Sequence, residues 1–239
     1  MSILESAVGW LSNPAHWQGT DGVPTRLLEH VELSALAVIL AILIGLPLGL
    51  AIGHTGRGSI VVVSIANIGR AVPSVALIVA FLPILGLGFR TTLVALVLLA
   101  IPPIVTNAYA GIRTIDPDLV EAARSVGMNG RQVLSQVELP AALPIVVTGI
   151  RTSAVQVVAT ATLGAIVAGG GLGRYIVDGF ALGDTPRIVA GAVLVAGLAI
   201  LTELVFALIE RLVVSPGLRA ERDGARQDLG RSSSATTPA

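Results

Sequence analysis

Long apolar stretches alternate with short polar intervals along the chain, and this pattern predicts helices that cross a membrane. A helix needs about 20 apolar residues to cross the hydrocarbon core of a bilayer. The pattern therefore predicts an all-α integral membrane protein with about five transmembrane helices. The five stretches cover residues 31–53, 60–87, 91–111, 141–168 and 188–214.

The second stretch is the least regular, because Asn67, Arg70 and Pro73 interrupt it. A proline inside a helix removes a backbone hydrogen bond and bends or ends the helix. Residues 60–68 are therefore either the first part of this span or a short interfacial helix, in which case the span begins near Val72.

The two ends of the chain are more polar than the middle. Residues 1–30 are expected to form an extracytoplasmic N-terminal segment and lack the pattern of a leader peptide. In this segment Trp10 and Trp17 suit a membrane boundary, and a loosely packed terminus accounts for them equally well. Residues 215–239 have few apolar groups to bury, so a disordered cytoplasmic tail is expected. The transmembrane domain is predicted over residues 31–214.

The arginines predict the orientation, because positive charge gathers on the cytoplasmic side of membrane proteins. Five spans place the two termini on opposite sides and divide the arginines unequally. The N-terminus is then outside, and the interval 113–140 and the tail are cytoplasmic, in a multi-pass protein of the cell membrane. The cytoplasmic group comprises Arg57, Arg113, Arg124, Arg131, Arg211, Arg219, Arg222, Arg226 and Arg231, and the outer group comprises Arg26, Arg90, Arg174 and Arg187.

Composition excludes several classes of function. The chain is 54% hydrophobic and only 13% charged, about half the share that is usual in soluble domains. All 15 basic residues are arginine, so a lysine-containing phosphate loop and a lysine Schiff base are excluded. The net charge of zero gives no reason to expect a nucleic-acid partner. His16, His30 and His54 are expected to be solvated and show no metal-binding spacing, so no catalytic residue and no metal site are expected.

The longest polar interval, residues 113–138, is predicted to form two short helices. Asp116 suits the N-cap of the first helix, with Pro117 in its first turn and Gly127 at its end. Asn129 suits the N-cap of the second helix, and Pro140 is expected to stop it.

A longer motif overlaps these helices. Glu121-Ala122-Ala123 is followed after three residues by Gly127, and after nine more by a segment that ends in Leu-Pro. This string resembles the E-A-A loop of the permeases of binding-protein-dependent ABC importers, with Val137 in place of isoleucine. The resemblance implies a cytoplasmic coupling loop over residues 113–140 that docks on an ATP-binding subunit. ATP would be bound by that partner, so no cofactor is expected in this chain. The implied docking residues are Glu121, Ala122, Ala123, Gly127, Leu139 and Pro140.

Other segments extend the resemblance over roughly residues 25–212. Residues 69–74 resemble the element that opens the second span in these permeases. The branch of permeases that imports the osmoprotectants glycine betaine, carnitine, choline or proline is the most similar. The resemblance therefore implies an osmoprotectant as solute, with another small solute such as an amino acid as the alternative. The segments typical of this branch are 103–107, 149–152, 161–165 and 169–173.

The resemblance also implies partners. Five spans are too few to enclose a solute path comfortably, so a second permease, identical or homologous, is expected. Two ATP-binding subunits would dock on the cytoplasmic side and a solute-binding protein on the outer side, with the lipid bilayer around the spans. The alternative is a secondary transporter driven by an ion gradient, which predicts paired intramembrane carboxylates. Only Glu203 is such a carboxylate, and that alternative leaves the E-A-A motif unexplained.

Several polar residues and a proline fall at membrane depth and are candidates for a translocation path. Polar side chains at this depth also join helices to one another, which is the commoner role. A carboxylate inside a span needs a partner, so Glu203 is expected to pair with Arg70 or Arg151, beside the path or in a purely structural pair. The path candidates are Arg70, Pro73, Asn107, Gln156, Thr160, Thr162 and Glu203.

Two glycine-rich segments carry further expectations. Gly45, Gly49 and Gly53 recur at four-residue spacing, which allows close packing of the first span against another helix. Residues 169–173 are expected to form either a flexible outer turn that contacts a binding protein or a structural turn.

Overall fold

The computed structural model describes residues 3–213, apart from the side chains of Leu4, Val63, Ile68 and Arg70. The expected tail at 215–239 lies outside the described residues. All regular structure in the described part is helical, as the apolar pattern predicted. The helices are α1 (Ile3–Ser12), η1 (Pro14–Trp17), α2 (Val23–Thr55), α3 (Ser59–Ala71), α4 (Ser74–Leu85), α5 (Phe89–Arg113), α6 (Pro117–Ser125), α7 (Gly130–Gln132), η2 (Val133–Glu138), α8 (Leu139–Thr160), η3 (Ala161–Val167), α9 (Gly173–Leu182) and α10 (Thr185–Val213).

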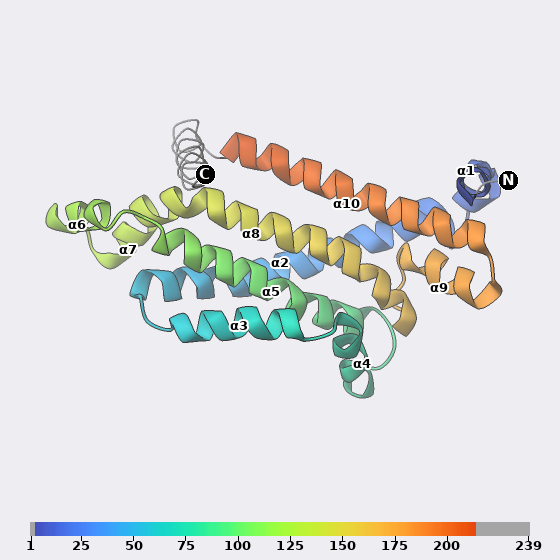
Figure 1. Cartoon of the computed structure of the whole chain (residues 1–239), viewed down its shortest axis with the longest axis horizontal. Coiled ribbons are helices and arrows are strands. Elements are labelled where there is room, and N and C mark those ends of the chain that lie inside the picture. Colours follow the sequence, from blue (N-terminus) through green and yellow to red (C-terminus); the bar gives the residue numbers. More distant parts are fainter. Residues whose placement is uncertain (1–2, 214–239) are drawn as a thin grey trace, which may run out of the picture.

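Four helical stretches in the described part are long and apolar enough to cross a membrane. They are α2, α5, the continuous stretch Gly130–Val167 that contains α8, and α10. These long helices run roughly along one axis, with α6 and α7 at one end of the molecule and α1 and α9 at the other (Figure 1). Four of the five predicted spans are therefore present as long helices.

Of the two alternatives for residues 60–87, the structure is closer to a separate first helix with a second one starting near Val72. This stretch forms α3 and α4, which are separated at Val72 and Pro73. Pro73 has no N–H to donate and disfavours helical geometry in the residue before it, so the helix ends ahead of the proline. In Figure 1, α3 lies alongside α5, whereas α4 turns across the axis of the long helices.

The glycines of α2 allow this helix to lie against α5, as their spacing predicted. A Cβ atom added at Gly49 would lie 2.7 Å from the Cβ of Ala108 and from the carbonyl oxygen of Val105. A Cβ at Gly53 would lie 2.7 Å from Ile112 Cβ. Neither position has room for a side chain, so the two backbones approach closely at both glycines.

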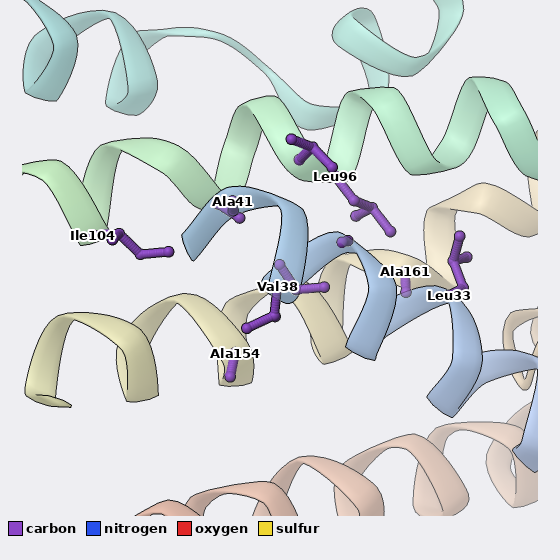
Figure 2. Close-up of a cluster of buried hydrophobic side chains, with 11 residues drawn as sticks. Leu33, Val38, Ala41, Leu96, Ile104, Ala154 and Ala161 are labelled. Atoms are coloured by element: carbon purple, nitrogen blue, oxygen red, sulfur yellow. The ribbon is translucent and has the colours of Figure 1, made fainter. Parts of the chain in front are cut away.

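The apolar core lies where α2, α5 and α8 meet (Figure 2). Leu33, Val38 and Ala41 of α2 pack there against Leu96 and Ile104 of α5, and α8 and η3 add small side chains such as Ala154 and Ala161. The small side chains of α8 and η3 let the three helices approach closely, so dispersion contacts along one buried seam hold the bundle together.

In contrast, α10 lies at the periphery. It packs on α8, α9 and α1 and leaves a long apolar surface uncovered. Ile200, Leu204 and Leu208 are each more than half exposed, at 61%, 61% and 58%. In a membrane this surface can face the lipid tails directly, because lipid is as apolar as leucine.

Candidate functional site

The loop that carries the E-A-A motif begins with a capped helix, as predicted. The side chain of Asp116 accepts a hydrogen bond from the N–H of Asp118 at 2.9 Å, and Pro117 lies in the first turn of α6. The helix is closed after Ser125 by Gly127, whose φ of +89° is accessible to glycine at little cost.

The start of the second loop helix is also as predicted. Asn129 accepts a hydrogen bond from the N–H of Gln132 at 3.1 Å, and the Gln132 side chain accepts one from the Asn129 N–H at 2.8 Å. These reciprocal bonds form a capping box and satisfy two N–H groups at the start of the helix.

The expectation that Pro140 stops this helix is wrong, because the chain stays helical from Gly130 through α8. The reason is the π-helical turn η2, in which the N–H of Leu139 bonds to the carbonyl of Leu134, five residues back. A proline in an α-helix collides with the carbonyl four residues earlier. The wider π turn relieves that collision, so Leu139 and Pro140 begin α8 instead of ending the loop.

The motif residues divide between the loop surface and its interior. Glu121 and Ala122 are exposed, whereas Ala123 is buried against the rest of the loop. Gly127 is exposed, and a Cβ there would meet no atom within 4 Å. Beside it, Val126 is 81% exposed. Thus α6 and the turn after it present small and apolar groups to the outside, at one end of the molecule (Figure 1).

A cleft of about 490 Å³ opens between α3, α4, α5 and α8. Three of the path candidates, Asn107, Gln156 and Thr160, line it. Thr106 and Thr152 line it too, although they were not among the candidates. The spacing of Thr152, Gln156 and Thr160 by four residues places them along one face of α8, and this periodicity is the signal that could have identified Thr152. Among the side chains that the structure describes, the lining contains amide, hydroxyl and apolar groups and no ionisable group.

Pro73, Thr162 and Glu203 are not among the residues that line this cleft. Pro73 is the exposed N-cap residue of α4, between two lining residues. Thr162 donates a hydrogen bond to the carbonyl of Ala159 at 2.7 Å, within its own helical stretch. The side chain of Arg70 lies outside the described residues, although its backbone belongs to α3.

Glu203 pairs with Arg151, one of the two partners expected for it. The guanidinium of Arg151 donates to Glu203 and, at 3.1 Å, to Glu210, so α8 and α10 are joined by an ionic cluster. None of these three residues lines the cleft. This geometry matches the structural alternative for Glu203.

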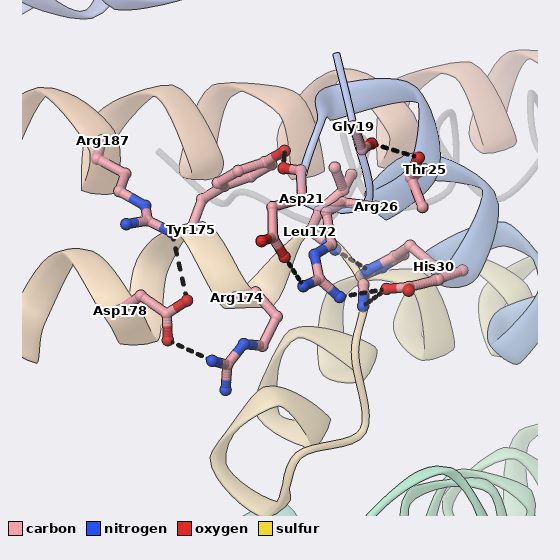
Figure 3. A network of polar contacts seen from close by, with 12 residues as sticks. Gly19, Asp21, Thr25, Arg26, His30, Leu172, Arg174, Tyr175, Asp178 and Arg187 are labelled. Atoms are coloured by element: carbon pink, nitrogen blue, oxygen red, sulfur yellow. Dashed lines mark hydrogen bonds and ion pairs between the residues drawn. The ribbon is translucent and has the colours of Figure 1, made fainter. Parts of the chain in front are cut away.

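At the other end of the molecule, a polar network fastens residues 169–173 to the start of α2 (Figure 3). The N–H of Gly171 donates to Glu29 at 2.8 Å, and the N–H of Leu172 donates to His30 Nδ1 at 3.3 Å. Glu29 also accepts from Arg26. Of the two alternatives for this glycine-rich segment, the structure supports the structural turn.

The expectation that the histidines are solvated is wrong for His54, whose side chain is only 20% exposed, and for His30, which is completely buried. Its Nε2 lies 2.9 Å from the carbonyl of Val158, and its Nδ1 accepts from Leu172. Both ring nitrogens are therefore used between α2, α8 and the glycine-rich turn, which assigns the proton to Nε2.

Tyr175 links the N-terminal segment to the same network. Its hydroxyl donates to the carbonyl of Asp21 at 2.7 Å, and its ring meets Trp10 edge-on at 5.2 Å. Burial raises the pKa of the Tyr175 phenol. Trp10 therefore packs on α9 and α10 rather than in a loose terminal segment.

Long apolar helices, an exposed loop at one end and a cleft whose described lining is polar are typical of a membrane-embedded transport subunit. Residues 37–215 match the family described as "Binding-protein-dependent transport system inner membrane component". The match covers most of the chain, and the chain belongs to this family. The resemblance to the permeases of binding-protein-dependent importers is thereby confirmed at the level of the family.

Two curated relatives illustrate the similarity. The chain is 38% identical to the glycine betaine/carnitine/choline transport system permease protein OpuCB of Bacillus subtilis (strain 168), over 82% of this chain and 90% of that protein. It is 36% identical to the choline transport system permease protein OpuBD of the same organism, over 95% of this chain and 97% of that protein.

The fold is similar to that of a solved permease chain. A chain of the inward-facing MetNI methionine ABC transporter superposes with a TM-score of 0.73 at 26% identity, covering 85% of this chain and all of that one. The protein is thus a permease subunit of an ABC importer, which is a transport subunit and not itself an enzyme.

Proposed function

We propose that this permease imports a small osmoprotectant of the quaternary ammonium type, such as glycine betaine, choline or carnitine. The observation that carries the proposal is the similarity, over 81–95% of the chain, to permeases whose names specify these solutes. The cleft is compatible with it, because the amide and hydroxyl groups described in its lining offer weak polar contacts to a small cation or zwitterion. A small amino acid is the alternative solute, as in the methionine transporter with the similar fold.

In this proposal the path lies along the cleft. Asn107, Gln156 and Thr160 would contact the passing solute, together with Thr106 and Thr152. The cleft is open on one side of the chain, which a second permease, identical or homologous, would close. Glu203 would serve α8–α10 packing, because its partner Arg151 and the ionic cluster lie outside the cleft.

The proposed partners follow from the loop. ATP-binding subunits would dock on α6 and the turn at Gly127, where small and apolar groups are exposed. ATP would be bound and hydrolysed there, outside this chain. A solute-binding protein would dock at the opposite end, near α9 and the turn between α4 and α5.

The proposed orientation places α6 and the C-terminus in the cytoplasm and the N-terminus outside. The chain contains no cysteine, so single cysteines report the orientation directly. Ser125→Cys and Leu182→Cys lie on exposed residues at opposite ends of the molecule. In intact cells, a membrane-impermeant maleimide should label the second and reach the first only after permeabilisation. The reverse labelling pattern would refute the orientation.

The central test compares two variants with the same local strain. Gly127 and Gly183 both have positive φ, at +89° and +68°, and neither has an atom within 4 Å of an added Cβ. Arginine at either position therefore has similar backbone cost, but only Gly127 lies in the proposed docking turn. Wild-type protein and Gly183→Arg should co-purify an ATP-binding subunit from mild detergent, and Gly127→Arg should not. The wild type should also take up radiolabelled glycine betaine or choline, and Gly127→Arg should not.

Two results would count against the proposal in different ways. Equal co-purification by the two arginine variants would refute the docking role of Gly127. Uptake of methionine or another amino acid, without uptake of any quaternary ammonium solute, would support the importer function but refute the proposed solute.

A further inference from the structure

His54 joins the cytoplasmic end of α2 to the coupling loop through a buried contact. It lies in the last turn of α2, and Glu138 is the last residue of the π turn η2. His54 Nδ1 lies 2.5 Å from Glu138 Oε2. A carboxylate can only accept, so the Nδ1–H of the imidazole donates to Glu138. The two residues are 84 positions apart in the sequence.

Both side chains are held in place by their surroundings. The Glu138 side chain is 5% exposed and that of His54 is 20% exposed. The other ring nitrogen of His54 faces Gly130, where an added Cβ would lie 3.3 Å from Nε2. The imidazole therefore fits between the start of α7 and the end of η2, and contacts both ends of the second half of the loop.

No other hydrogen bond or ion pair joins residues 23–55 to residues 114–138 within the part of the chain that the structure describes. The loop leaves α5 and runs into α8, so these two helices are connected to it by the backbone. In contrast, α2 has no such connection. Any displacement of the loop reaches the cytoplasmic end of α2 through the His54–Glu138 contact or through the helices packed beside it.

We propose that His54 and Glu138 are positioning residues that tie α2 to the coupling loop, so that α2 follows the loop when the ATP-binding subunits move it. The inference rests on the proposed function, since it needs a loop that an ATPase displaces. A buried carboxylate without a partner is costly in free energy. The His54–Glu138 contact therefore stays closed throughout the motion of the loop. Helix α2 also packs on α5, beside the cleft. Without the His54–Glu138 contact, α2 would not move with the loop and the other helices.

The test measures uptake and ATP hydrolysis in the same proteoliposomes, which contain the permease with its ATP-binding subunits and binding protein. His54→Ala should lower the solute taken up per ATP hydrolysed by about tenfold, in the range of typical coupling between sites. His54→Asn should keep this ratio near the wild-type value, because its amide N–H can replace Nδ1–H.

Thr55→Ala is the matched control. The Thr55 side chain lies one residue further on and, within the described residues, donates to carbonyls of its own helix, those of Ala51 and Ile52. Its uptake per ATP should equal that of the wild type. The double variant His54→Ala/Glu138→Ala removes the unpaired buried carboxylate, so it should restore stability and remain uncoupled.

Three outcomes would refute the proposal that His54 and Glu138 tie α2 to the coupling loop. One is a wild-type ratio in His54→Ala. Another is recovery of coupling in the double variant, which would show that only the unpaired charge was harmful. The last is a parallel loss of uptake, hydrolysis and bound ATPase in His54→Asn, which would indicate a purely structural contact. Failure of the wild-type protein itself to bind an ATPase or transport a solute would instead refute the proposed function.

Discussion

Replacing Arg151 by methionine should destabilise the bundle far more than replacing Glu203 by glutamine. Arg151 on α8 pairs with both Glu203 and Glu210 on α10. An unpaired carboxylate near the middle of a span costs about 2.5–3.5 kcal/mol on insertion scales. Arg151→Met leaves Glu203 in that state, whereas Glu203→Gln leaves Arg151 beside Glu210 at 3.1 Å. We expect losses of about 3 kcal/mol and about 1 kcal/mol or less, respectively.

Thermal unfolding in detergent, followed by fluorescence-detected size exclusion, measures the difference. A change of 1 kcal/mol shifts Tm by about 2–4 °C in a chain of this size, so Arg151→Met should lower Tm by about 6–12 °C. Glu203→Gln should lower it by less than about 4 °C. Arg90→Met is the matched control, because Arg90 is exposed at the start of α5. Its Tm should be close to that of the wild type.

The double variant Arg151→Met/Glu203→Gln separates charge from packing. Removing the carboxylate as well should return most of the Tm lost in Arg151→Met. The reasoning would be refuted if Glu203→Gln were as unstable as Arg151→Met, or if the double variant were no better than the single arginine variant.

Three other variants test different parts of the structure. Gly49→Leu should prevent α2 from packing on α5 and reduce the yield of folded protein, whereas Gly197→Leu, where an added Cβ meets no atom within 4 Å, should not; recovery after detergent extraction measures both. Gln156→Leu should lower the uptake rate several-fold without changing Tm, and Thr162→Val, outside the cleft, should leave uptake unchanged. His30→Ala should lower stability by about 3 kcal/mol, since it removes a buried ring and two hydrogen bonds; an unchanged Tm would contradict the assigned contacts.

The long helices could be predicted because membrane depth demands a length and a composition that a single sequence displays. The caps at Asp116 and Asn129 could also be predicted, since their hydrogen bonds close within three residues. Glu203 could be assigned to one of two arginines because few cations fall at membrane depth. Each of these inferences needs only local chemistry or the chemistry of the bilayer.

The features that could not be predicted depend on partners far along the chain. His54 and Glu138 are distant in sequence, and neither lies in a pattern that points to the other. His30 meets Val158 and Leu172 only because three elements converge on it. The π turn before Pro140 is equally invisible, because an α-helix that stops at the proline fits the same residues.

That π turn fixes the rotational phase of α8. Each residue advances an α-helix by about 100°, and the turn over Val133–Glu138 inserts its extra residue before the whole of α8. Deleting one residue there would rotate every later side chain of α8 by about 100° around its axis. Gln156 would then turn away from the cleft and Arg151 away from Glu203. The alignment of a helix that contacts both the cleft and α10 therefore depends on the length of a segment close to neither.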